Sequence, residues 1–339
     1  LLTKKILSKI SFIVGKKSKQ LHKPYLINGN EKKYLNECIK SSYISSSAGK
    51  FIQLFENKIM KLTKSKNVVS VINGTSGLHL ALKAIGIKKN DEVLVPSLTF
   101  VGTCNSIIYS EAIPHFVDSS LESYGVDGKK LEKYLLKNTK VVSGSCYNIK
   151  TKRKIKAIII VHLFGHPAKI DPIIKIAKKF KLKIIEDAAE SIGSYYKKKH
   201  TGTIGHVGVI SFNGNKSLTT GGGGVVLTNQ KKIAQKIRTL ASTAKINHPY
   251  KYLHSEVGYN YRLANINAAI GCAQIEKISK IIHSQRKLFK KYKNIFKEMK
   301  EVEILDEPEE CFSNFWLQTL ILKKKNQYSI DFILKYLNQ

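Results

Sequence analysis

Apolar positions along the chain follow two spacings in turn, and this alternation predicts an α/β protein. From residue 68 onward, short and nearly all-apolar runs alternate with longer segments in which apolar residues recur at helical spacing. The runs that read as strands span 68–72, 91–96, 113–118, 155–164 and 181–187, and the helical segments between them span 74–86, 99–111, 128–137 and 171–180. Strands that are apolar on both faces need helices on both sides. The pattern therefore predicts a mainly parallel sheet in a three-layer α/β/α domain.

The pattern changes beyond residue 200. The apolar runs 206–212 and 223–229 are joined by a short polar and glycine-rich stretch, which predicts a hairpin-like part of the sheet. Further on, a long helical pattern over 265–299, a strand-like run over 315–323 and a last helix over 331–337 predict a smaller α+β domain. Because the chain stops just after that helix, we expect the small domain to lack C-terminal elements.

These patterns divide the chain into a large domain over 45–264, a small C-terminal domain over 265–339 and an N-terminal helical segment over 1–44. The N-terminal segment carries apolar residues at helical spacing with lysines between them, and we expect it to pack on the small domain. A basic amphipathic helix on a membrane surface is the alternative. Lys9 interrupts any signal-peptide core, and no apolar run reaches the length of a membrane span, so we expect no stable membrane insertion. The lysine-rich segment 139–154 is expected to be a surface insertion.

Composition adds one unusual feature, a formal net charge of +34 over 339 residues. Such a charge is compatible with a nucleic-acid or membrane-surface binding protein, which is the alternative of another class. However, lysine far outnumbers arginine, and no basic block is interleaved with aromatic residues as a stacking platform would need. We therefore expect no nucleic-acid partner and interpret the charge as a lysine-rich surface around a cleft that takes an anionic small substrate.

The five cysteines are widely separated, none has the close spacing of a zinc site, and the chain has no HExxH pattern. The sequence therefore predicts no metal site. The simplest interpretation of five widely separated cysteines is that they are reduced thiols in a cytoplasmic protein.

Two candidate sites follow predicted strands, where ligands of open α/β sheets collect. In NGTSG (73–77), Gly74 is expected to permit a tight turn, and Thr75 and Ser76 to cap the next helix, whose N-terminus suits a phosphate group. An ordinary N-cap is the alternative. In EDAAES (186–191), Asp187 leaves an apolar strand and needs a cationic partner or a metal, unless the segment is a surface turn.

The third candidate is SFNGNKSLTTGGGG (211–224), in which Lys216 lies at the edge of the predicted sheet. Loss of solvation there favours the neutral amine, which attacks carbonyl groups. Ser211 and Asn213 supply polar donors, and glycines 221–224 are expected to let the returning strand pass close to a ligand. A single loop lysine is more often a solvated surface residue. A phosphate site, a strand-end aspartate and a lysine together, however, are the groups that pyridoxal phosphate requires.

Several motifs resemble those of the DegT/DnrJ-type sugar aminotransferases, which are pyridoxal phosphate enzymes of fold type I. The resemblance runs from about residue 26 to the end and includes INGTSGLHLAL, VPSLTFVGTCNSI, PHFVD, IEDAAES, SFNGNK followed by GGGG, and GYNYRLANINAAIGCAQIEKI. More narrowly, LHKP, SSSAGKFIQLFE, HLFGHP and HTGTIGHVGVISFNGNK resemble the LegC-like subgroup, which makes 4-amino sugars toward legionaminic acid and related nonulosonates.

The resemblance implies a role for each matched residue. It implies that Lys216 bonds covalently to the cofactor and then moves a proton, and that Asp187 pairs with the pyridinium nitrogen. Phe100 is expected to stack on one face of the ring, with Ala189 on the other. The full expected cofactor set is Gly74, Thr75, Ser76, Phe100, Asp187, Ala189, Glu190, Ser211, Asn213 and Lys216, with Asn260 from a neighbouring subunit; of these, Thr75, Ser76 and Ser211 hold the phosphate. Glu190 stands where many relatives carry glutamine or histidine near the 3′ oxygen, and contact with the substrate is its alternative role.

The resemblance also bears on the GYNYR motif, at residues 258–262. The resemblance implies that Asn260, in GYNYR, reaches the phosphate of a neighbouring subunit, so that a homodimer shares its active sites. Arg262 in the same motif is expected to serve the substrate or the interface, with a structural ion pair as the alternative. No role is assigned to Lys152 and Arg153.

The reaction implied is transfer of an amino group from glutamate to the C4 ketone of a UDP-linked 4-keto-6-deoxy-2-acetamido sugar, for nonulosonate or surface-glycan synthesis. Lys216 stands where some relatives carry a histidine and dehydrate sugars, which favours transamination. A C3-acting enzyme and a GDP- or dTDP-linked sugar are the alternatives.

Overall fold

The structure, a computed structural model, describes residues 2–15, 29–323 and 327–337. The motif LHKP, at 21–24, lies outside the described residues. Nine strands form the central sheet: β1 (Asn67–Val71), β2 (Glu92–Pro96), β3 (Ile113–Val117), β4 (Thr139–Val142), β5 (Ser145–Asn148), β6 (Lys154–Val161), β7 (Lys183–Asp187), β10 (Val207–Ser211) and β11 (Gly224–Thr228).

The main path through this sheet is β1-β11-β10-β7-β6-β2-β3. The pairs from β10 through β7, β6 and β2 to β3 are all parallel. Along this path, β11 alone runs against its neighbours, because it pairs antiparallel with both β1 and β10. The predicted mainly parallel sheet with one hairpin-like part is therefore confirmed.

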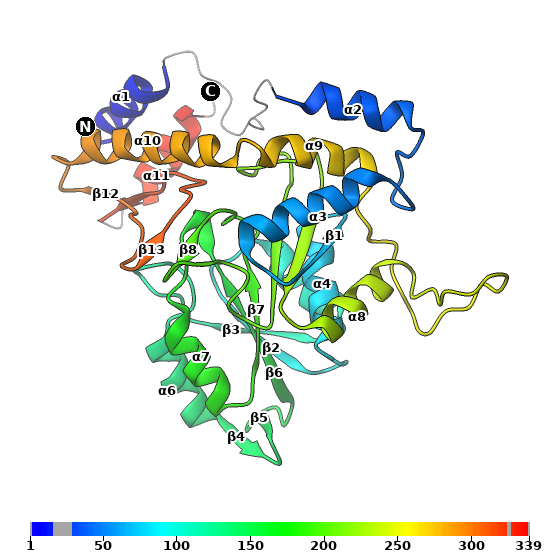
Figure 1. Cartoon of the computed structure of the whole chain (residues 1–339). Helices are drawn as coiled ribbons and strands as arrows, with labels where there is room; N and C mark the ends of the chain where they lie inside the picture. The colour runs from blue at the N-terminus through cyan, green and yellow to red at the C-terminus, as the bar shows by residue number, and fades with distance from the viewer. Residues whose placement is uncertain (1, 16–28, 324–326, 338–339) are drawn as a thin grey trace.

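Helices cover both faces of the sheet (Figure 1). One face packs against α4 (Gly74–Ala84), α5 (Val101–Tyr109) and α8 (Lys231–Ala241), and the other against α3 (Lys50–Thr63), α6 (Gly128–Asn138), α7 (Ile170–Lys179) and α9 (Asn265–Ile275). Successive strand residues point to opposite faces. Val93 and Val95 of β2 pack on the face covered by α4, α5 and α8, whereas Leu94 packs on the face covered by α6 and α7. Each such side chain contributes roughly 1.5–3 kcal/mol when buried, so both faces need a helical cover.

The segment 139–154 differs from the expected surface insertion. It forms the hairpin β4–β5, and β5 pairs with β6, so the hairpin extends the sheet. Cys146 is fully buried, and the buried Asn148 donates a hydrogen bond to Glu92 at 3.0 Å. Lysines hid this strand pair, because Lys140 on β4 is exposed and Lys150 and Lys152 lie in the exposed connection between β5 and β6.

The helical pattern over 265–299 is divided in the structure. Helix α9 ends at Ile275, and α10 (Ile278–Phe296) begins after a break at Glu276 and Lys277. The Glu276 carboxylate accepts hydrogen bonds from Asn30, Tyr34 and Lys58 at 2.8–3.0 Å. Contacts with distant segments therefore fix the break, and nothing in the local pattern indicates it.

The remaining elements lie around α9 and α10 (Figure 1). They are α1 (Leu2–Val14), α2 (Glu31–Lys40), α11 (Gln327–Leu337), the paired strands β12 (Val302–Ile304) and β14 (Leu320–Leu322), and a small sheet of β8 (Tyr195–Tyr196), β9 (Lys199–His200) and β13 (Cys311–Phe312). Helix α1 packs on α10 and α11, and α2 packs on α9. Of the predicted strand 315–323 only β14 is a strand, because the left-handed Phe315 (φ 50°) turns the chain before it. The domain boundaries stay a prediction.

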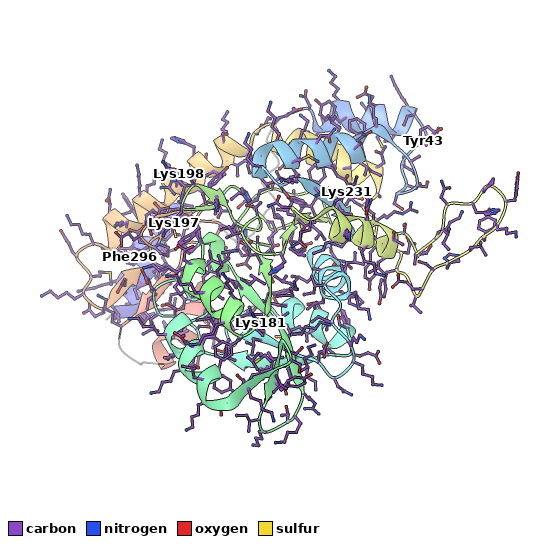
Figure 2. The ribbon with its side chains drawn as sticks, turned by 60° about the horizontal axis from the view of Figure 1, so that its bottom comes forward. Tyr43, Lys181, Lys197, Lys198, Lys231 and Phe296 are labelled. Carbon is purple, nitrogen blue, oxygen red and sulfur yellow. The ribbon has the colours of Figure 1, made fainter. Side chains whose placement is uncertain are left out.

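None of the described helices is both long and apolar enough to cross a membrane. The positive charge is spread over the surface: Figure 2 shows the exposed Lys181, Lys198 and Lys231 well apart from one another, after α7, beside β9 and at the start of α8.

Candidate active site

The parallel strands end at a cavity of about 370 Å³. Its walls come from the ends of β6, β7 and β10, from the start of α4, from the turn before α5 and from residue 316. The lining residues are Asn73, Gly74, Thr75, Leu78, Phe100, Gly102, Thr103, Val161, Asp187, Ala189, Glu190, Ser211, Asn213, Asn215, Lys216 and Trp316. Of the residues expected to hold the cofactor of their own subunit, all but Ser76 are among them.

The start of α4 is capped differently from the prediction. Asn73, rather than Thr75 or Ser76, is the N-cap, since its Oδ1 accepts the Ser76 backbone N–H at 2.8 Å. Ser76 itself is buried in the first turn and does not line the cavity. An asparagine cap leaves the neighbouring N–H groups and the positive helix end available to an anion.

The glycines near the cavity have packing roles that the sequence did not indicate. Gly74 is helical, and its need for a small residue comes from packing, because a Cβ there would lie 3.0 Å from the Cβ of Ser211. None of glycines 221–224 lines the cavity. A Cβ on Gly224 would lie 2.9–3.0 Å from the backbone of Asn73 and Gly74. The absence of a side chain at Gly224 therefore lets β11 approach the start of α4, and the expected closeness of this strand to a ligand stays a prediction.

Asp187 is buried at the end of β7. Its Oδ2 accepts a hydrogen bond from Thr103 Oγ1 at 2.7 Å, and its Oδ1 accepts one from the Ala189 N–H at 3.1 Å. Burial raises the pKa of this carboxyl group, while these hydrogen bonds and nearby Lys216 oppose the increase. A cation brought into the cavity would stabilise the ionised form further. Thr103 was missed from the sequence because it lies inside a helix pattern.

The adjacent Glu186 is also buried but belongs to a separate network. Its carboxylate accepts hydrogen bonds from His162 Nε2 at 3.0 Å and from three backbone N–H groups of the turn 202–205 at 2.6–2.8 Å. Burial alone would raise its pKa, but these donors hold the pKa below the usual range. Of the adjacent carboxylates Glu186 and Asp187 at the end of β7, only Asp187 therefore lines the cavity.

Lys216 pairs with Glu190, the nitrogen lying 3.2 Å from Oε1. The other carboxylate oxygen of Glu190 accepts the Phe164 N–H at 2.7 Å. Burial raises the pKa of Glu190, and Lys216 and the Phe164 N–H oppose this increase. The Lys216 side chain is only 14% exposed. The lysine is thus held in the cavity, unlike a solvated surface residue.

Trp316 completes the wall beside Lys216, whose nitrogen lies 3.8 Å from the centre of a Trp316 ring. Sequence reasoning missed this residue, since Trp316 lies 100 positions away in a run expected to be a strand of the small domain. Its one signal is that it is the only tryptophan of the chain.

Asn260 and Arg262 do not reach the cavity of their own chain. Asn260 is exposed and forms an isolated bridge with Ser242, at the base of the segment between α8 and α9, which extends away from the body (Figure 1). Arg262 is exposed and forms no ion pair with any residue that the structure describes. Within the same described residues, no group of three or more His, Cys, Asp or Glu side chains could hold a metal ion.

These groups fit pyridoxal phosphate. The start of α4, with Thr75 and Ser211, offers donors to a phosphate, the Asp187 carboxyl group offers a partner to a ring nitrogen, and Lys216 offers an amine to an aldehyde. The cavity volume is within the range of small-molecule sites. Phe100 and Ala189 border the same space.

Comparisons with known proteins agree with this chemistry. The profile of the DegT/DnrJ/EryC1/StrS aminotransferase family matches residues 26–339. The chain is 39% identical over 297 residues to GDP-perosamine synthase of Escherichia coli O157:H7, covering 88% of this chain and 76% of that protein. It is 37% identical over 299 residues to EpsN of Bacillus subtilis (strain 168), whose name assigns it provisionally to the pyridoxal phosphate-dependent aminotransferases, covering 88% and 74%. A solved DegT DnrJ EryC1 StrS aminotransferase from Brucella abortus is similar with a TM-score of 0.76 and 29% identity, covering 86% and 74%.

Proposed function

Because the chain belongs to the DegT/DnrJ/EryC1/StrS aminotransferase family, we propose that it aminates a nucleotide-linked sugar, with glutamate as donor and the C4 ketone of a 4-keto-6-deoxy sugar as acceptor. The chain is an aminotransferase and uses pyridoxal phosphate. One observation carries the proposal: a single cavity brings together the Lys216 amine, the buried Asp187 carboxyl group and the N-terminus of α4.

Each of these groups then has its own role in binding the cofactor or in moving the proton. Pyridoxal phosphate, when bound, supplies an electron-withdrawing ring that makes the proton on the adjacent carbon removable. Lys216 holds the cofactor and carries that proton at its Nζ, in a place only 14% exposed to water. Asp187 pairs with the protonated ring nitrogen, and Thr103 keeps the carboxylate oriented. The start of α4, with Thr75 and Ser211, binds the phosphate.

UDP, GDP and dTDP remain candidates for the nucleotide of the sugar substrate, and specific observations support the first two. The LegC-like motifs support a UDP-linked 2-acetamido sugar on the way to legionaminic-type nonulosonates. The relative in Escherichia coli O157:H7, at 39% identity, is named for a GDP-linked product and supports GDP equally. Either diphosphate is an anion that the basic surface would attract, since positive potential speeds the capture of anionic ligands.

A product assay separates these candidates. The purified protein would be incubated with pyridoxal phosphate, glutamate and UDP-, GDP- or dTDP-linked keto sugars, and the products analysed by mass spectrometry. We expect one nucleotide series to be converted from ketone to amine, and Lys216→Ala to make no product. No aminated sugar in any series, from a protein that also forms no visible cofactor band, would contradict the proposal.

We also propose that the enzyme is a homodimer with shared active sites, in which Asn260 reaches the partner's phosphate site. The segment that carries it is rich in exposed apolar residues, with Tyr250 85% and Val257 81% exposed. Phe100, at the cavity, and Tyr109 of α5 are also exposed. Apolar surface of this extent is usually covered by another subunit.

We also propose that the protein is located in the cytoplasm. All five cysteines are free thiols, although Cys38, Cys146 and Cys272 are buried and would be protected in any compartment. Detection of the untagged protein in the fraction that holds nucleotide sugars tests this location.

A further inference from the structure

One wall of the cavity comes from the C-terminal part of the chain. The Lys216 nitrogen lies 3.8 Å from the centre of a Trp316 ring and 3.2 Å from Glu190 Oε1. The amine therefore lies between a carboxylate and the electron-rich face of an indole. Both groups stabilise a cation, and the indole does so most strongly where water is excluded.

Hydrogen bonds fix the indole in this place. Trp316 Nε1 donates to the Asn215 carbonyl at 2.8 Å, one residue before Lys216. The Trp316 backbone N–H donates to Asn314 Oδ1 at 2.8 Å. The amide of Asn314 in turn donates to the Glu190 and Ile192 carbonyls at 3.0 and 2.9 Å. The two partners of Lys216 are thus tied to each other through Asn314.

The segment that bears Trp316 is itself firmly anchored. Phe315 is buried and stacks on Phe289 of α10 with ring centres 3.8 Å apart. Arg286 of α10 donates to Glu307 and to the Ser313 carbonyl at 2.6–2.9 Å. Gly165, with φ +96°, leaves the space that the Asn314 side chain fills, since a Cβ there would overlap Oδ1. The position of the indole is therefore set by the fold.

We propose that Trp316 is a positioning residue for Lys216: its indole face holds the amine, together with Glu190, at the place where the cofactor is bound. The inference rests on the proposed function and adds a residue from the C-terminal part of the chain to it. The Asp187 carboxyl group at the end of β7 also interacts electrostatically with Lys216. No motif of the sequence pairs Trp316 with Lys216.

A rate measurement tests this role. Trp316→Leu removes the aromatic face, and Trp316→Phe keeps a smaller one. The rate at which added pyridoxal phosphate produces the visible band of its bond to Lys216 is measured at neutral pH. The neutral amine is the form that attacks the aldehyde, so we expect the band to form about tenfold faster in Trp316→Leu, because the cation loses the indole, whereas a merely structural role would slow it. Trp316→Phe should recover most of the difference.

Phe312→Leu is the matched control, because Phe312 lies in the same segment but contacts Arg286 and Tyr195 instead of Lys216. It should keep the wild-type rate. A Trp316→Leu protein that forms the band no faster than wild type would overturn the inference and leave the proposed function intact. A wild-type protein without any visible band would overturn the proposed function itself.

A second measurement needs no Trp316 variant. Trp316 is the only tryptophan of the sequence, so the tryptophan emission of the cofactor-free protein reports this ring alone. We expect Lys216→Met, which removes the cation beside the indole, to shift the emission maximum. Identical maxima in the two proteins would contradict the contact.

Discussion

The side chain of Asp187 illustrates how the site balances opposing effects on one residue. Burial favours its neutral form, whereas pairing with a ring cation needs the ionised form. The hydroxyl group of Thr103, 2.7 Å away, is the side-chain donor that opposes burial. Hydrogen bonds to charged groups are worth about 1.5–3 kcal/mol, so this hydroxyl group decides how readily Asp187 ionises.

At the scale of single residues, we predict the effect of Thr103→Val, which keeps the shape of the side chain and removes the hydroxyl group that donates to Asp187. The pKa of Asp187 should rise further, and the dissociation constant for pyridoxal phosphate at neutral pH should increase about tenfold, equivalent to about 1.4 kcal/mol. Titration of the visible band measures it. Ser106→Ala is the control, because that buried hydroxyl group donates to the Thr103 carbonyl instead. Equal affinities of Thr103→Val and wild type would refute the role of Thr103.

At the scale of elements, the site depends on how closely β11 approaches the start of α4. Gly224 opposes the backbone of Asn73 and Gly74, which cannot move aside as a side chain could. Gly222, two residues earlier, faces open space with nothing within 4 Å. The glycine run therefore contains an open position, Gly222, beside tightly packed ones: Gly224 against backbone, and Gly223, where a Cβ would overlap the side chain of Thr220.

We predict opposite outcomes for Gly224 and Gly222. Gly224→Ala should lower the free energy of unfolding by about 1–3 kcal/mol, because a Cβ would push the N-terminus of α4 from the strand. It should also weaken cofactor binding, since that helix end is the proposed phosphate site. Gly222→Ala should change stability by less than about 0.5 kcal/mol. Urea unfolding measures both, and similar losses for the two variants would contradict this account.

At the scale of the whole molecule, three buried histidines make stability depend on pH. Burial lowers the pKa of His79, His166 and His200 to about 4, from 6.5 in the unfolded chain. Between these values the unfolded chain binds more protons, so the free energy of unfolding falls as the pH falls.

We therefore predict loss of stability from about pH 6.5 to pH 4, with up to about 1.4 kcal/mol per pH unit from each histidine. Urea unfolding at a series of pH values measures the slope. His79→Phe, which keeps a ring among Tyr109, Tyr259 and Tyr261, should reduce the slope by one histidine's share. An unchanged slope in this variant would show that His79 is not the group that titrates.

The proposed dimer makes a prediction at the same scale. Co-expressed Lys216→Ala and Asn260→Ala chains should show about a quarter of wild-type activity, because half of randomly mixed dimers carry one complete site. Each variant alone should show far less. Lys216→Ala mixed with Asp187→Ala is the control, since both residues belong to one subunit's site and no mixed dimer is complete. Equal activities of the two mixtures would exclude a shared site.

The sequence by itself determined the alternation of strands and helices and, through it, the site. Parallel strands must place their carboxyl ends together, so Gly74, Asp187 and Lys216 line one cavity although they are far apart in the chain. The hydrophobic period also identified the hairpin of β10 and β11. These features follow from local spacing and from a topological rule, and both can be read without coordinates.

Only the tertiary structure decided which neighbours complete the site. Asn73 caps α4 in place of the predicted residues, Thr103 reaches Asp187 from another helix, and Trp316 meets Lys216 from 100 positions away. The break between α9 and α10 likewise depends on donors from distant segments. Such contacts depend on how elements pack, and the packing energy of one side chain is shared among partners that local sequence does not specify.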